Sequence, residues 1–168
     1  YPGDYFSAEA PEKYKIKGSF GHPVPVVDGK TQSSGAKASA IVLKKEFTDV
    51  KDLLCIDYTS AYSTPSLDKL VRTFVYDRQG KGSFTVGDEF TANAPIRFET
   101  AITTQANWKI IDDTHLLLTT GTEQMTVTIE ASGKVAFTSE TIEVNSPAYT
   151  RIGISLKEQS KDGYTKQL

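Results

Sequence analysis

The sequence predicts an all-β fold, an antiparallel β-sandwich that is supersandwich-like and has about ten or more strands. Apolar and polar residues alternate with a period of two along most of the chain, which is the pattern of a half-buried strand. Thr, Val, Ile, Phe and Tyr dominate these stretches, as they do on a pleated surface. Turns of about two to six residues separate the stretches, and this spacing favours a sandwich.

The first predicted strands lie in the stretch KASAIVLKKEFTDVKDLL and the residues that follow it. Residues 39–47 fit a strand, a turn is expected near Asp49–Lys51, and residues 53–59 fit a second strand. The apolar residues fit helical spacing tolerably as well, because short apolar runs are ambiguous by period alone. The surrounding segments are strands with short connections, and they favour the strand interpretation here.

The next part of the chain predicts a turn and a hairpin. A short helical turn is expected over Pro65–Lys69, because Thr64 suits an N-cap and Pro65 suits the first helical position. A strand begins near Leu70, turns over Gln79–Gly82 and returns through Ser83–Val86.

The later part of the chain predicts further strands. Three regions follow the same alternation: residues 96–103, two short strands joined at Asp112–Thr114, and a β-hairpin over residues 124–140. A strand at residues 149–157 closes the series. Residues 1–13 and 157–168 are expected to be peripheral or frayed.

Length and composition limit the possible functions. A chain of 168 residues suits one domain, expected to span residues 1–168. The net charge of −2 gives no basic surplus for phosphates, so no nucleic-acid partner is expected. No apolar stretch approaches the length of about 20 residues that spans a bilayer, so no membrane partner is expected. Cys55 is the single cysteine, and its apolar neighbours predict a buried, inert thiol.

Two histidines limit the catalytic options. The chain has no G-x-S-x-G, no HExxH and no His-x-His, so neither a serine nucleophile nor a first-row metal site is expected. His115 begins a strand and is expected to be exposed or at an edge. His22 follows Gly21 in a loop, where the rigid Pro23 and Pro25 hold it in a position to act as general acid, base or hydrogen-bond donor. The residues alone leave a purely structural role for His22 open.

An ordered set of motifs resembles a known family. The stretches GHPVPVVDGKTQ, DYTSAY, LVRTFVYDR and VGDEF follow one another between about residues 15 and 104. This order is similar to that of the C-terminal β-domain of heparinase II/III-like polysaccharide lyases, in which a Gly/Ser-His opening runs into V-(D/N)-G-x-x-Q. The remainder of the chain resembles the family only in the rhythm of its strands.

The resemblance implies that the chain is the C-terminal part of a larger enzyme whose N-terminal α/α toroid is not in this sequence. Such enzymes cleave uronic-acid-containing polysaccharides by β-elimination, in which a Tyr or His removes the proton beside the carboxylate and nearby donors stabilise the enolate. Most of these residues would lie on the toroid, so the chain alone is expected to be inactive. The matching positions imply a catalytic role for His22 and a substrate-binding role for Gln32, for which a structural turn role is equally open.

The resemblance further implies a periplasmic or extracellular protein that acts on an acidic polysaccharide, such as a glycosaminoglycan or alginate. Pro23 stands where many members have Asn, which removes an amide side chain and a backbone donor. Val24 stands where metal-binding members have a second histidine, so no metal and no cofactor are expected.

A stand-alone carbohydrate-binding or structural β-sandwich module is the alternative function. The aromatic residues that could stack on sugars are Trp108, Tyr58, Tyr62 and Tyr76, and packing between the two sheets is the competing role for each. The lyase interpretation also predicts an exposed apolar or aromatic patch around residues 1–30, on the side that would meet the toroid.

Overall fold

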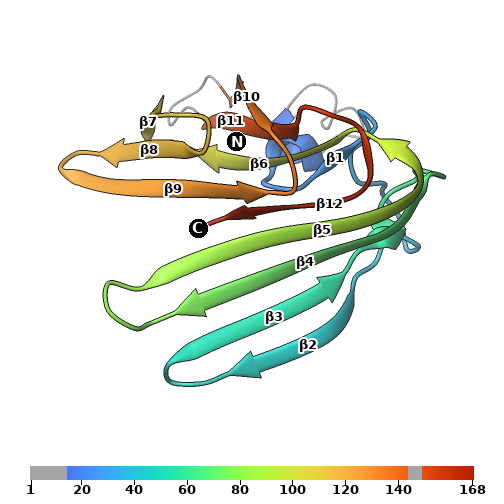
Figure 1. Cartoon of the computed structure of the whole chain (residues 1–168), viewed down its shortest axis with the longest axis horizontal. Coiled ribbons are helices and arrows are strands. Elements are labelled where there is room, and N and C mark those ends of the chain that lie inside the picture. The colour runs from blue at the N-terminus through green and yellow to red at the C-terminus, as the bar shows by residue number, and fades with distance from the viewer. Residues whose placement is uncertain (1–14, 144–148) are drawn as a thin grey trace, which may run out of the picture.

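The computed structural model describes residues 15–143 and 149–168 and consists of two antiparallel β-sheets (Figure 1). The small sheet has the strand order β1 (Val26–Val27), β6 (Phe98–Thr104), β11 (Tyr149–Leu156), β10 (Val135–Glu143). The large sheet has the order β2 (Ile41–Phe47), β3 (Lys51–Asp57), β4 (Leu67–Asp77), β5 (Ser83–Ile96), β12 (Ser160–Gln167), β9 (Glu123–Ala131), β8 (His115–Thr120), β7 (Asn107–Ile110). The described residues also form three short 3₁₀ helices: η1 (Lys15–Lys17), η2 (Ser19–Gly21) and η3 (Thr59–Ala61). The predicted antiparallel sandwich is confirmed.

The core lies between the two sheets. Phe90 on β5 and Phe98 on β6 stack with their ring centroids 4.7 Å apart, and both rings are almost completely buried. Ile152 and Ile154 from β11 are fully buried in the same cluster. Burial of each such side chain stabilises the fold by about 1.5–3 kcal/mol, so these contacts between the sheets hold the sandwich together.

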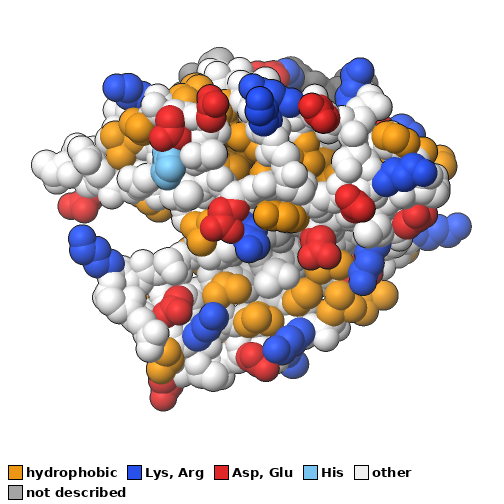
Figure 2. Space-filling model, in the orientation of Figure 1, with side chains coloured by type: hydrophobic (Ala, Val, Ile, Leu, Met, Phe, Trp, Pro, Cys, Tyr) orange, Lys and Arg blue, Asp and Glu red, His pale blue; other side chains and the backbone are white. Residues whose placement is uncertain are grey.

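The small sheet leaves part of the large sheet uncovered. Figure 1 shows β2 and β3 on the side of the molecule away from β6, β10 and β11, and every residue of β2 is exposed. Figure 2 shows hydrophobic side chains gathered on the lower part of this face. The large exposed apolar residues of β2 are Ile41, Val42, Leu43 and Phe47, and the neighbouring strands β4 and β5 add Tyr76 and Phe84. The exposed apolar patch predicted around residues 1–30 is absent from residues 15–30, and residues 1–14 lie outside the described part of the chain.

Several predicted elements are confirmed. The two strands of the ambiguous stretch are β2 and β3, which pair with each other. The β4–β5 hairpin turns where expected, and Asp112–Thr114 joins β7 to β8. However, β5 is longer than predicted: the returning strand was expected to end at Val86, and it continues through Pro95 to Ile96.

The predicted hairpin over residues 124–140 is wrong. Its two strands exist as β9 and β10, but β9 pairs with β8 and β12 in the large sheet, while β10 pairs with β11 in the small sheet. The turn at Ser132–Lys134 therefore crosses from one sheet to the other. Alternation and turn residues are the same in both arrangements, so only the distant pairing partners distinguish them.

The prediction of a frayed C-terminal end is also wrong. Strand β12 lies in the interior of the large sheet, between β5 and β9. Thr165 is fully buried and Gln167 nearly so. The sequence SKDGYTKQ is polar, and the residues that face the core are Gly163, Thr165 and Gln167 rather than large apolar ones. The apolar alternation that would predict an interior strand is therefore missing.

The helical turn expected at Pro65–Lys69 is a tight turn instead. The Leu67 N–H donates to the Thr64 carbonyl at 3.0 Å, and β4 begins at Leu67. The Thr64 hydroxyl is buried and has no partner among the described residues, so it is not a cap. Cys55 is half-buried rather than buried, and accepts a weak hydrogen bond from the Thr73 hydroxyl.

Candidate functional site

His22 directly follows η2, and its side chain is exposed. Its backbone N–H donates to the Ser19 carbonyl at 3.1 Å. The preceding Gly21 is buried against η1, where a Cβ would lie 2.4 Å from the Ile16 Cα. A larger residue at this position would force the backbone to move, so Gly21 lets η1 and η2 pack closely and fixes where His22 leaves the fold.

The chain after His22 is anchored by side chains of the core. The Arg72 Nη1 donates to the Pro23 carbonyl at 2.6 Å. The Tyr62 hydroxyl donates to the Pro25 carbonyl at 2.8 Å, and Pro25 is fully buried. Two prolines with fixed φ and two anchored carbonyls make this segment a rigid support for the exposed imidazole.

Arg72 belongs to a buried polar network between the sheets. Its Nε and Nη2 each donate to Asp88 at 2.7 Å, one to each carboxylate oxygen. The Tyr58 hydroxyl donates to Asp88 at 2.6 Å, and the Thr100 hydroxyl donates to it at 2.9 Å. Thr100 also accepts from Gln167 Nε2 at 3.2 Å, so β4, β5, β6 and β12 all meet at this network.

The network shifts the ionisation of its members. Burial raises the pKa of Tyr58, and the Asp88 charge adds to this effect. Burial alone would lower the pKa of Arg72, but its hydrogen bonds to Asp88 and the charge of that carboxylate outweigh burial and raise it. The Arg72 guanidinium is therefore held in its charged form, and its two hydrogen bonds to Asp88 join β4 to β5 inside the sandwich.

Gln32 lines a cavity of about 740 Å³ beside η1 and η2. The walls are Lys15, Lys17, Gly18, Ser19, Phe20, Thr31, Gln32, Ser33 and Ser34. The Gln32 N–H donates to the Ser19 hydroxyl at 3.1 Å. Burial raises the pKa of Tyr62, and a side-chain hydrogen bond with Gln32 opposes this rise.

The structure brings the two predicted site residues to the same short helix but not into the same cavity. His22 binds the Ser19 carbonyl and Gln32 binds the Ser19 hydroxyl through their backbone N–H groups. His22 is not among the residues that line the cavity. His22 is exposed outside the cavity lining, whereas Gln32 is part of that lining.

Sequence reasoning missed the residues that position this region. Arg72 and Asp88 are directly opposite each other on β4 and β5, and both interrupt faces that are otherwise apolar. A positive and a negative residue at core-facing positions of two neighbouring predicted strands indicate a buried ion pair, and this pattern could have identified Arg72 and Asp88. Lys15 and Lys17 gave no such signal, because lysines on a polar segment are ordinary surface residues.

His115 has no contact with this region in the described structure. It is half-exposed at the start of β8, as predicted, and its Nδ1 lies 2.8 Å from the Asp112 carboxylate. The pKa of Asp112 is lowered to about 2, by the Thr114 backbone N–H first and by His115 second. This arrangement caps the turn between β7 and β8 and is structural.

The aromatic residues proposed for sugar stacking separate into two groups. Tyr58 and Tyr62 are buried in the core and cannot stack on a ligand. Trp108 is half-buried and packs against the core cluster. Tyr76 is exposed, with the Arg78 guanidinium 4.7 Å from its ring centroid.

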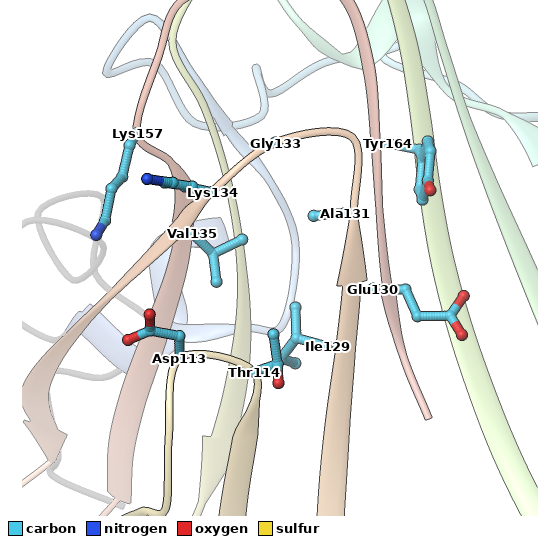
Figure 3. A pocket seen from close by; sticks show the side chains of 10 residues that line it. All are labelled: Asp113, Thr114, Ile129, Glu130, Ala131, Gly133, Lys134, Val135, Lys157 and Tyr164. Atoms are coloured by element: carbon cyan, nitrogen blue, oxygen red, sulfur yellow. The ribbon is translucent and has the colours of Figure 1, made fainter.

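A second cavity, of about 480 Å³, lies where the turn before β8, the end of β9 and the start of β10 meet (Figure 3). Lys157, after β11, and Tyr164 on β12 also line it. Asp113 and Glu130 share its walls with Lys134 and Lys157, so charges of both signs line it. It contains none of the predicted site residues. No group of three or more His, Cys, Asp or Glu residues able to hold a metal occurs in residues 15–143 and 149–168.

Comparisons with known proteins bear on the fold. No family model matches the chain, and no curated protein matches it either. A crystal structure of heparinase III matches with a TM-score of 0.69 and 17% identity over 96% of this chain. A heparan sulfate lyase from Pedobacter heparinus matches with a TM-score of 0.67 and 13% identity over 99% of this chain. A further heparinase III, with methylated lysines, has a TM-score of 0.66 and 11% identity.

These matches extend the resemblance beyond residue 104, where the motifs end, to nearly the whole chain. The chain spans about a quarter of the length of each matched structure, 25% of the first and 26% of the other two. No helix in the described residues is long and apolar enough to cross a membrane. The chain therefore has the fold of a heparinase III-like β-sandwich domain.

Proposed function

We propose that this chain is the β-domain of a heparinase II/III-like polysaccharide lyase and forms one face of the substrate cleft. The proposal rests on a fold shared with a quarter of each heparinase III structure, and on an exposed histidine held by a buried network. The single observation that carries it is the anchoring of the His22–Pro23 segment by Arg72. Arg72 and Tyr62 fix the backbone just after His22, so the exposed histidine is attached to a rigid segment.

The reaction in this proposal is β-elimination on a uronic-acid-containing polysaccharide. A base removes the proton beside the carboxylate, the C–O bond to the neighbouring sugar breaks, and the leaving oxygen takes up a proton. His22 assists as acid, base or hydrogen-bond donor, and Gln32 contacts the substrate. The remaining groups come from an N-terminal α/α toroid, and the protein acts in the periplasm or outside the cell.

The test compares the 168-residue chain with the full-length protein on uronate-containing polysaccharides, measured by the absorbance of unsaturated uronates. We expect turnover only in the full-length protein, and a loss of about 100-fold or more in kcat for His22→Ala. His115→Ala is the matched control and should keep full activity. Turnover by the chain alone, or unchanged kcat in His22→Ala, would contradict the proposal.

A stand-alone carbohydrate-binding module is the second candidate, and the exposed Tyr76 favours it. In that case the isolated chain would bind glycans and Tyr76→Ala would abolish binding, while His22→Ala would not. The burial of Tyr58 and Tyr62 removes two of the four aromatic platforms that this candidate relied on.

A further inference from the structure

We propose that the cavity formed by η1, η2 and residues 31–34 binds an acidic sugar unit, with its carboxylate or sulfate held by Lys15 and Lys17. This inference deepens the proposed function and rests on it for the class of ligand, a uronate-containing polysaccharide. It adds a binding subsite, with residues of its own, beside the histidine that assists the chemistry.

The composition of the cavity wall supports an anionic and hydroxylated ligand. Among the described residues that line it are two lysines, four hydroxyl side chains and the Gln32 amide, and none of these described residues carries a carboxylate. Three other cavities in the described part of the chain each include at least one carboxylate: Asp113 and Glu130, Asp28 and Glu99, and Glu89. The volume of about 740 Å³ is within the range of small-molecule sites.

Phe20 gives the cavity an apolar surface next to these cations. Its ring centroid lies 5.8 Å from the Lys15 ammonium and 4.4 Å from the Arg151 guanidinium. Aromatic rings are the usual apolar platform for a sugar ring in a protein site. A ligand that offers both a sugar ring and an acidic group therefore matches Phe20 and the lysines together.

The buried Arg151 guanidinium contacts the Phe20 ring. Its side chain is 3% exposed, and one Nη atom pairs with Glu99 at 2.5 Å. Its Nε and other Nη are buried and have no hydrogen-bond partner in the described structure. Glu99 balances the charge of this guanidinium, so the contribution of Arg151 to the cavity is to hold the Phe20 ring in place.

Glu140 limits the positive charge in the unliganded protein, because its carboxylate forms an ion pair with Lys15. Both side chains are about half-exposed, so the pair contributes little stability. An acidic ligand would compete with Glu140 for Lys15. Removal of that carboxylate should therefore tighten binding.

The experiment measures binding to the 168-residue chain by calorimetry and by NMR chemical shifts. The probes are a heparin tetrasaccharide, an unsulfated oligogalacturonate tetrasaccharide, neutral cellotetraose and inorganic sulfate. We expect both acidic tetrasaccharides to bind and to shift the resonances of residues 15–20 and 31–34. Cellotetraose should bind at least tenfold more weakly, and so should inorganic sulfate. The stronger of the two acidic probes identifies sulfate or carboxylate as the preferred group.

Variants assign the site. Lys15→Ala, Lys17→Ala and Gln32→Ala should each weaken binding about three- to tenfold, the effect of losing one ordinary hydrogen bond at a solvent-exposed site. Glu140→Gln should tighten binding severalfold. Lys81→Ala, in the β4–β5 turn, is the matched control and should bind as the wild type does. Phe20→Leu keeps an apolar side chain and should weaken binding without unfolding the chain.

Several results would overturn the inference. The first is an affinity for cellotetraose equal to that for the acidic tetrasaccharides. The second is an affinity for inorganic sulfate equal to that for the acidic tetrasaccharides. The third is unchanged binding of the acidic tetrasaccharides by both Lys15→Ala and Lys17→Ala. The proposed function fails separately. If the full-length protein cleaves no uronate polymer but the lysine variants weaken binding, the cavity is a sugar site outside a lyase. If His22→Ala abolishes turnover but the lysine variants bind and turn over normally, the lyase stands and the subsite is wrong.

Discussion

The guanidinium of Arg72 joins two parts of the molecule that are far apart in the sequence. Its Nη1 lies 2.6 Å from the Pro23 carbonyl oxygen, while its other two donors each lie 2.7 Å from the Asp88 carboxylate. One side chain therefore satisfies a buried carboxylate and holds the residue after His22. The buried charge pair of the core and the backbone position that follows His22 therefore depend on the same side chain.

Replacement of Arg72 by Met should destabilise the protein strongly. Asp88 would remain buried without a counter-charge, and breaking a buried pair in this way costs about 3–5 kcal/mol. Urea unfolding of the isolated chain measures the loss. The double variant Arg72→Met, Asp88→Leu should recover part of it, because no unpaired charge remains.

The matched control for this experiment is Arg78→Met. Arg78 and Asp52 also form an ion pair, at 2.5 Å, but both side chains are partly exposed. Exposed pairs contribute about 0–1 kcal/mol. Equal losses for Arg72→Met and Arg78→Met would show that the buried network has no special role.

Two fully buried threonines should respond in opposite ways to replacement by valine. Thr165 has a buried hydroxyl with no partner in the described structure, so Thr165→Val should be neutral or stabilise the protein by about 1 kcal/mol. Thr100 has hydrogen bonds to Asp88, Arg72 and Gln167, so Thr100→Val should cost about 2–3 kcal/mol. Denaturant midpoints of the two variants give the comparison, and a marked loss in Thr165→Val would contradict it.

Stability should fall as the pH rises above about 10. Burial raises the pKa of Tyr58 and of Tyr62 above the ordinary tyrosine value of 10.0. The unfolded chain releases these two protons near pH 10, whereas the folded protein retains them. Their contribution is therefore fully present below pH 10 and decreases above it.

Urea unfolding between pH 8 and pH 11 measures this dependence. Tyr58→Phe loses the hydrogen bond to Asp88 and should be less stable at pH 8 by about 1–2 kcal/mol. Its stability should then decrease less steeply above pH 10 than that of the wild type. Tyr164→Phe controls for the loss of an exposed hydroxyl. A slope above pH 10 that is unchanged in Tyr58→Phe would refute the assignment.

Gly21→Ala should disturb the region that carries His22 and the cavity. Its Cβ would lie 2.4 Å from the backbone of both Lys15 and Ile16, so η1 must move away from η2. We expect a loss of about 1–3 kcal/mol and weaker binding of acidic tetrasaccharides. Gly133→Ala is the control, because its Cβ would have no neighbour within 4 Å. Equal behaviour of the two variants would show that η1 and η2 need not be close.

The sequence predicted the strands well because alternation is a local property. The pairs β2–β3, β4–β5 and β7–β8 were predicted with their turns, since each joins neighbours in the sequence. The failures at β9–β10 and at β12 share one cause. In both places the partner strand is distant in sequence, and period and turn residues carry no information about it.

The site was predicted only in part for a related reason. The prolines around His22 indicated a rigid support, but the groups that provide it, Arg72 and Tyr62, come from strand β4 and the segment after η3. The cavity around Gln32 likewise combines η1 and η2 with residues 31–34. Such combinations arise from tertiary packing, and a pattern along one segment cannot show them.

The position of β12 has a consequence for the order of folding. The strands β2 to β5 and β7 to β9 form two meanders, each built from hairpins between sequence neighbours. Only β12, which follows all other strands, pairs with both β5 and β9 and so unites the meanders. On a ribosome the two half-sheets can therefore form early, but their facing edges remain unpaired until the last strand emerges. Completion of the large sheet is a late, non-local and hence slow step, and until β12 pairs these open edges can pair with another chain instead.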